Sequence, residues 1–209
     1  MKDNRNYIWD SEEVSNRPEY VYIEKWIPNN ARVIDLGCGN GSLLQILREK
    51  KNISEFGIEI TESGVGICRE KRLNVRQGRI DVELSDITDN SFDFAICNVT
   101  IQMVMYPEVT LAEMKRIAKF QIISFPNFAF LPQRLDLLFE GRMPRRLLYG
   151  YDWYNTGHIH QLSIRDFKQT ISSLELKVRD SVYLGRFGRL KYIFPNLLAS
   201  EAIFLLEKR

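Results

Sequence analysis

Several features that mark particular protein classes are missing from this 209-residue sequence. Its three cysteines show no paired spacing, which argues against a disulfide framework and against a zinc site. It has no apolar run as long as a membrane-spanning helix, and its polar start lacks the apolar core of a secretion signal. We therefore expect a cytoplasmic protein without a membrane-spanning helix, in which Cys68 and Cys97 are small core residues.

A strong charge of either sign is also missing, since 29 Lys and Arg residues stand against 27 Asp and Glu residues. The net charge of +2 argues against a nucleic-acid partner. Hydrophobic residues make up 44% of the chain, enough for a substantial core. We predict a single domain over residues 1–209 with a polar N-terminal arm over 1–16. The apolar cluster at 7–9 could be loose or could fold over a ligand site.

What the sequence does contain is a glycine-rich turn between a strand and a helix. Residues 31–36 form a short apolar run typical of a buried strand, and helical spacing begins at Ser42. The turn between them consists of Gly37, Cys38, Gly39, Asn40 and Gly41. Such a turn lets the backbone approach a ligand closely and presents the free N–H groups of a helix start. This pattern predicts a nucleotide site at the carboxyl end of the first strand.

Two acidic residues narrow the class of ligand. Asp35 precedes the glycines, and Glu59 lies near the end of the next apolar run, about 20 residues beyond them. A carboxylate at Asp35 would repel a pyrophosphate but suits an amine or a cation, and Glu59 can accept hydrogen bonds from both ribose hydroxyls. The glycine spacing also differs from the G-x-G-x-x-G of dinucleotide sites. The pattern favours a charged nucleoside over a dinucleotide such as NAD.

Strands and helices alternate along most of the chain. Further strands are predicted over 55–60, 73–77, 92–97, 120–125, 174–184 and 201–206, and helices over 18–27, 42–50, 61–72, 107–119 and 163–173. Residues 127–162 interrupt this alternation, as an insertion that faces a substrate or a partner, and residues 185–189 form a basic connection. We predict an α/β fold with a doubly wound, mostly parallel, seven-stranded sheet.

The loop and its two acids closely resemble the S-adenosylmethionine (SAM) loop of class I methyltransferases. The resemblance implies SAM as cofactor and S-adenosylhomocysteine as product. It places the glycines at the methionine portion, Asp35 near the amino group and Glu59 at the ribose. The residues predicted to bind the cofactor are Asp35, Gly37, Cys38, Gly39, Asn40, Gly41, Glu59, Ile60, Gly78, Arg79, Ile80 and Asn98.

The adenine end of the predicted site departs from the class I pattern. Ile60 and Ile80 could pack on the adenine. Such proteins usually carry an acid after the third strand to meet the adenine amino group, but this chain has Gly78 and Arg79 there. Arg79 cannot accept a hydrogen bond, whereas Asp81 could do so from nearby.

The methyl acceptor should bind at the ends of the fourth and fifth strands and the segment after them. Methyl transfer from SAM is an in-line displacement, so the protein chiefly aligns the nucleophile and excludes water. The candidates are Asn98, Thr100, Gln102, Phe125, Asn127, Tyr151, Trp153, His158 and His160. His158 and His160 face the same way in an extended segment, and each could be a general base or a structural residue. Asn98 could contact the methionine moiety or cap its strand.

The segment 127–162 interleaves aromatic residues with arginines. The arginines are Arg134, Arg142, Arg145 and Arg146. They could clamp a carboxylate or phosphate of a substrate, form a solvated helix face, or contact a partner protein.

Motifs in this second half closely resemble the MetW family of methionine-biosynthesis proteins. They are S-F-P-N-F at 124–128, E-G-R-M-P at 140–144, W-Y-N-T-G-H-I-H at 153–160 and S-I-R-D-F at 163–167. The resemblance covers about 18–184 and implies association with a homoserine O-acyltransferase (MetX). Two alternative functions follow. In the first, the chain methylates a small polar or anionic acceptor bound by residues 127–160. In the second, the chain binds SAM but is not a catalyst, and it acts as a partner and regulator of that acyltransferase.

Overall fold

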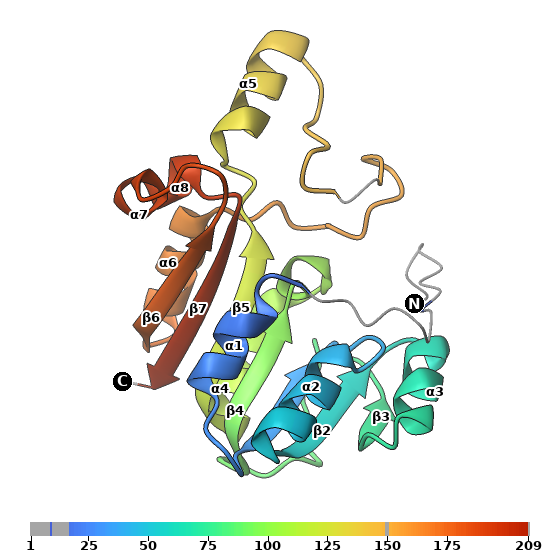
Figure 1. The fold of residues 1–209 in the computed structure, drawn as a ribbon. Coiled ribbons are helices and arrows are strands. Elements are labelled where there is room, and N and C mark those ends of the chain that lie inside the picture. The colour runs from blue at the N-terminus through green and yellow to red at the C-terminus, as the bar shows by residue number, and fades with distance from the viewer. Residues whose placement is uncertain (1–8, 10–16, 149–150, 209) are drawn as a thin grey trace.

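The computed structural model describes residue 9 and residues 17–148 and 151–208 (Figure 1). The strands are β1 (Arg32–Leu36), β2 (Ser54–Glu59), β3 (Val75–Gln77), β4 (Phe92–Asn98), β5 (Ala118–Pro126), β6 (Leu176–Leu184) and β7 (Glu201–Lys208). The helices are α1 (Tyr20–Trp26), α2 (Ser42–Lys51), α3 (Glu62–Glu70), the 3-10 helix η1 (Ile101–Met103), α4 (Pro107–Ile117), α5 (Leu131–Glu140), α6 (Ile164–Ser173), α7 (Leu190–Ile193) and α8 (Pro195–Leu198). No helix within these ranges is long and apolar enough to cross a membrane.

The strands form one seven-stranded sheet in the order β3-β2-β1-β4-β5-β7-β6. Strands β1 to β5 are parallel, and β7 runs antiparallel to both of its neighbours. This confirms the predicted α/β fold with a mostly parallel sheet. The strand order reverses between β1 and β4, which is where open α/β sheets place their ligands. Asp35 is paired with Gly57 on one side and with Ile96 on the other, so it lies at this reversal.

Both faces of the sheet are covered, as a doubly wound fold requires. Ile34 and Leu36 pack in a cluster with residues of α4 and α6, whereas Val33 packs in a second cluster with residues of α1, α2 and α3. Successive residues of a strand point to opposite faces, so a strand buried on both faces is apolar throughout. Phe125, one of the acceptor-side candidates, is fully buried in the first cluster with its ring centroid 4.7 Å from that of Phe167.

Three helices lie where none was predicted. α5 falls inside the 127–162 insertion, and α7 and α8 lie between the last two strands. α5 carries the usual end signals, with proline in its first turn and Gly141 in a left-handed conformation (φ 62°) at its end. It stands away from the sheet in Figure 1, and Gln133 is the sole buried residue among its ten. The part of the arm predicted at 1–8 and 10–16 lies outside the described residues.

Candidate functional site

The glycine-rich loop joins β1 to α2 and is tied to the end of β2. The backbone N–H groups of Gly37 and Cys38 both donate to Ile58 O, at 2.8 and 3.2 Å. Asn40 Oδ1 accepts from Ser42 N and Ser42 Oγ at 3.2 and 2.7 Å, so the Asn40 side chain satisfies the first N–H of α2, whose N-cap residue is Gly41. These bonds hold the loop at the carboxyl ends of two neighbouring strands.

The carboxylates of Asp35 and Glu59, both predicted to bind the cofactor, are buried beneath this loop. Glu59 accepts from Gly39 N (2.9 Å) through Oε2, and from Thr61 N (2.9 Å) and Thr61 Oγ1 (2.8 Å) through Oε1. Asp35 is 2% exposed, and its Oδ1 has no hydrogen-bond partner in the part of the chain that the structure describes. Burial and then repulsion by Glu59 raise the pKa of Asp35 from 3.8 to about 7. The pair is therefore an anionic site that favours a positively charged group.

The residues that follow β4 pack against the glycine-rich loop. A methyl group built at Gly37, which has a φ of +85°, would lie 2.6 Å from Thr100 Cγ2, so glycine is required there. Val99 adopts a φ of +51°, which is rare for a β-branched residue. Its N–H is held by Ser124 O at 3.1 Å and Ser124 Oγ at 2.9 Å. Strained backbone of this kind is concentrated at functional sites, which agrees with a site at the end of β4.

Asn98 is held by two residues that the sequence analysis missed. Its Nδ2 donates to Glu19 Oε1 at 3.1 Å, and its Oδ1 accepts from Ser124 Oγ at 2.6 Å. Glu19 is 2% exposed, although an acid in the first turn of a predicted helix is usually at the surface. The Asn98 amide therefore braces the end of β4.

Two loop residues of the predicted set contact the protein core. The Cys38 thiol would lie 2.8 Å from a methyl group built at Gly57 on β2. A methyl group at Gly41 would clash with Leu73 Cδ1 and would lie 2.8 Å from Cys68 Sγ. Gly41 thus allows the loop to pack against α3 and against Leu73, three residues beyond that helix. Ligand contacts of Cys38 and Gly41 stay a prediction.

The residues predicted to lie near the adenine differ in their exposure and in their hydrogen-bond partners. Ile60 is 47% exposed, whereas Ile80 is 6% exposed and belongs to the core. Gly78 N donates to Glu59 O at 3.0 Å. Arg79 makes two 2.9 Å bonds to Asp81, and although burial opposes ionisation, these bonds lower the pKa of Asp81. Both carboxylate oxygens of Asp81 thus already accept hydrogen bonds from Arg79.

The structure brings both histidines to η1, directly after β4. Gln102 O accepts from His160 N at 3.0 Å, and the Gln102 Nε2 atom lies 3.4 Å from His158 Nε2. His158 is 7% exposed and its ring packs edge-on against Phe128 with 5.8 Å between centroids. The sequence candidates Gln102, His158 and His160 therefore form one cluster.

Other acceptor-side candidates are not part of this cluster. Asn127 is fully buried, and its Nδ2 donates to Ala199 O at 2.8 Å. Tyr151 and Trp153 are 43% and 71% exposed. Asn127 is thus a structural residue, and the two aromatic residues belong to the surface.

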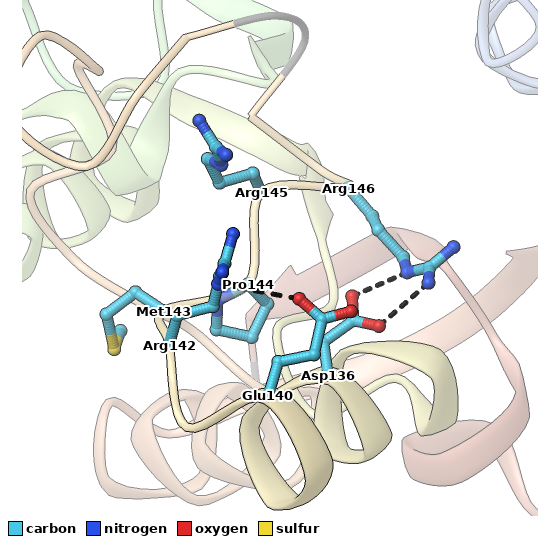
Figure 2. Close-up of a pocket in the computed structure, with 7 residues that line it drawn as sticks. All are labelled: Asp136, Glu140, Arg142, Met143, Pro144, Arg145 and Arg146. Atoms are coloured by element: carbon cyan, nitrogen blue, oxygen red, sulfur yellow. Dashed lines mark hydrogen bonds and ion pairs between the residues drawn. The ribbon is translucent and has the colours of Figure 1, made fainter.

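The arginines after α5 lie around a small cavity of about 150 Å³ (Figure 2). Its lining residues are Asp136, Glu140, Arg142, Met143, Pro144, Arg145 and Arg146. Arg146 makes bonds of 2.5 and 2.7 Å to Asp136, and Arg142 lies 3.6 Å from Glu140. Arg145 pairs with Asp152. Because each arginine faces a carboxylate, the cavity carries no unopposed positive charge for an anion.

Comparison with solved structures shows which fold this chain has. A SAM-dependent methyltransferase from Archaeoglobus fulgidus matches with a TM-score of 0.65 and 16% identity, over 90% of this chain and 92% of that one. One from Mesorhizobium loti matches with a TM-score of 0.67 and 11% identity, over 93% and 100%. The chain has the Rossmann-like fold of SAM-dependent methyltransferases.

Sequence comparison then gives the family. A profile of the methionine biosynthesis protein MetW matches residues 17–206. The "Bifunctional methionine biosynthesis protein MetXA/MetW" of Rhodopirellula baltica is 33% identical over 196 residues, which cover 87% of this chain. The chain belongs to the MetW family, as the sequence motifs predicted. It spans 31% of the length of that relative.

The raised pKa of Asp35 predicts an unusual effect of Asp35→Asn on stability. Near pH 4 Asp35 is protonated in the folded chain, and above that pH the unfolded chain ionises first, so folding is progressively disfavoured up to about pH 7. Asp35→Asn removes this penalty and should raise the free energy of unfolding at pH 8, on the order of a few kcal/mol, with little change near pH 4. Urea unfolding at pH 4 and at pH 8 measures the free energy of unfolding of the two chains.

The matched control is Asp93→Asn. The guanidinium of Arg32 lowers the pKa of Asp93, so this change should reduce stability at pH 8, opposite in sign to Asp35→Asn. An Asp35→Asn chain no more stable than the unchanged chain at pH 8 would show that Asp35 carries no unfavourable buried charge.

Proposed function

We propose that this chain binds SAM at the carboxyl ends of β1 and β2 and methylates a small polar or anionic acceptor. The observation that carries the proposal is the buried pair Asp35 and Glu59. Two carboxylates in one buried site repel each other, and Asp35 Oδ1 has no partner among the described residues. A cation bound between loop and strand ends would relieve this repulsion.

SAM fits these groups better than a dinucleotide does. It carries a positive sulfonium and an ammonium group, which Asp35 would attract. Glu59 keeps lone pairs for ribose hydroxyls beside its bonds to Gly39 and Thr61. The pyrophosphate of NAD would meet two carboxylates instead of a glycine-rich anion site. Ile60, exposed beside Glu59, is an apolar contact for the adenine.

When bound, SAM supplies an activated methyl group, and the chain must align an acceptor against it. Thr100 contacts the loop at Gly37, and Gln102, two residues further on, joins the segment that carries the histidines. His160 Nε2 is buried and has no hydrogen-bond partner within the described residues. We assign it the role of general base toward a hydroxyl or amine acceptor. His158 orients this segment, and Asn98 positions the end of β4.

Glu59→Gln tests the SAM site. The amide keeps the shape of the side chain but loses the charge and one acceptor oxygen, so affinity for SAM should fall about tenfold or more. Isothermal titration calorimetry measures it. Glu62→Gln, an exposed residue in the first turn of α3, is the control and should bind like the unchanged chain. Equal affinity of both variants would contradict a ribose contact by Glu59.

His160→Gln tests catalysis. Formation of S-adenosylhomocysteine should be followed with SAM and fractionated small metabolites, and the variant should lower kcat at least about tenfold while SAM affinity is unchanged. An unchanged rate of turnover in the variant would show that His160 is not the general base. SAM binding with no turnover in any fraction would favour the second function below.

A second function, as partner of an acyltransferase, is supported by the outer face of α5. Leu135, Leu138 and Phe139 lie at positions i, i+3 and i+4 and are 40%, 72% and 78% exposed. An apolar stripe of this kind on a helix that stands off the sheet is typical of a protein interface. The relative from Rhodopirellula baltica bears the name MetXA/MetW, with 69% of its length outside the match. We propose a MetX-type homoserine O-acyltransferase as the occupant of this face.

The double variant Leu138→Asp/Phe139→Asp tests this interface. Buried aspartates would be desolvated without partners, so binding to a purified MetX-type protein should fall more than about 100-fold. Co-elution and calorimetry measure it, together with the rate of the acyltransferase. Ile193→Asp, at a 65% exposed apolar position on α7, is the matched control. Unchanged binding of the double variant would place the interface elsewhere.

A further inference from the structure

A cavity of about 440 Å³ lies where α6, α7 and α8 meet the start of α5 (Figure 1). Three cations line it, one from α5 and two from α6, namely Arg134, Arg165 and Lys168. Apolar side chains that include Ile193 and Phe194 form much of the remaining lining, and no carboxylate of the described residues lines it. Cavities of this size hold small organic ligands. None of the residues to which we assigned SAM binding or catalysis lines it, so it is a separate place in the molecule.

The walls of this cavity are held together by Asn196 on α8. Its Oδ1 accepts from Arg165 N at 3.0 Å, which ties α8 to α6. Its backbone oxygen accepts from Asn127 Nδ2 at 3.2 Å and from Arg134 Nη2 at 3.4 Å. Arg134 Nε also donates to Ala129 O at 2.5 Å. Backbone carbonyls thus orient the guanidinium of Arg134 without cancelling its charge, and the cavity is formed by the chain itself.

The positive charge at this cavity is not balanced by acids of the chain. Neither Arg165 nor Lys168 forms an ion pair with a carboxylate among the residues that the structure describes. Asp166, which follows Arg165, instead accepts from Ser163 Oγ at 2.6 Å in the capping box of α6. Lys168 Nζ lies 5.8 Å from the centroid of the Tyr183 ring, a contact that leaves its charge in place. The cavity therefore differs from the one after α5, in which each arginine faces a carboxylate.

Apolar surface borders these cations. Ile193 and Phe194 are 65% and 57% exposed, so large hydrocarbon side chains meet water at the edge of the cavity. An inorganic anion would leave this surface in water, and an uncharged hydrocarbon would take water from the cations without pairing them. A molecule that carries an anionic group on an apolar body satisfies both parts of the lining.

We propose that this cavity binds an amphipathic organic anion, a small molecule with a carboxylate or phosphate group on a hydrocarbon body. The anionic group meets Arg134, Arg165 and Lys168, and the planar guanidinium groups match the paired oxygens of either anion. The hydrocarbon packs against Ile193 and Phe194. This site is independent of the SAM site, and it stands whether or not the chain methylates an acceptor.

The first test is calorimetric titration of the full chain with octanoate and with octyl phosphate, each below its micelle-forming concentration. 1-Octanol, which lacks the charge, and inorganic phosphate, which lacks the hydrocarbon, are the reference ligands. Octanoate, octyl phosphate or both should bind at least about tenfold more tightly than either reference. Octanol binding as tightly as the two anions would overturn the role of the cations, and inorganic phosphate doing so would overturn the role of the apolar wall.

Variants then locate the site. The double variant Arg165→Gln/Lys168→Gln should weaken binding of the tighter anion about tenfold or more, and Ile193→Ser should weaken it less. Arg186→Gln/Arg189→Gln is the matched control, because it removes two exposed cations that do not line the cavity, and it should bind like the unchanged chain. Unchanged binding by the first double variant would overturn the assignment to this cavity. Failure of the unchanged chain to bind either anion would also overturn it, while SAM binding, measured on the same samples, would be unaffected.

Discussion

Two carboxylates buried side by side under one loop are the constraint on which this site depends. Parallel strands end at the same edge of a sheet, so the neighbours β1 and β2 bring Asp35 and Glu59 together without any special turn. Glu59 then holds the loop through Gly39 N. Burial first, and repulsion by Glu59 second, disfavour the charged form of Asp35, and the fold carries this unfavourable energy when no cation is bound. A chain selected for stability alone would place an amide at one of the two positions.

The fold could be read from the sequence because its signals are local. Apolar runs, helix caps and alternating glycines each act within a few residues, and the order of strands and helices then requires a mostly parallel sheet. The contacts around Asn98 gave no such signal. Glu19 and Ser124 lie 79 and 26 residues away along the chain, and the three side chains meet through folding alone. Asn98 could therefore be predicted from its place at the end of a strand, whereas its partners Glu19 and Ser124 could not.

α5 was missed for a different reason. Its proline and its terminal glycine are regular helix signals, but the expected pattern of a buried apolar face has no counterpart in a helix that buries Gln133 alone. Its apolar residues read as part of an irregular, aromatic and arginine-rich segment. Three of the four arginines that could have been an anion clamp face carboxylates, as Arg146 does with Asp136, whereas Arg134 donates to the backbone carbonyl of Ala129. The exposed apolar face of α5, and not the arginines, is therefore the feature of this segment that supports the proposed partner.

The proposed site at the glycine-rich loop draws on parts of the chain that have different roles. The loop, Asp35 and Glu59 lie at the ends of the sheet strands and, in the proposed site, would select the class of nucleoside. Residues that approach from outside the sheet, Trp9 before it and His160 after β5, meet the loop or the adjoining η1. Because the sheet alone cannot distinguish one acceptor from another, specificity has to come from these added segments. The same added segment that carries His160 also carries α5, so a protein bound to α5 lies on the part of the chain that would hold the acceptor. In the two functions proposed above, acceptor binding and partner binding would therefore be linked through one stretch of sequence.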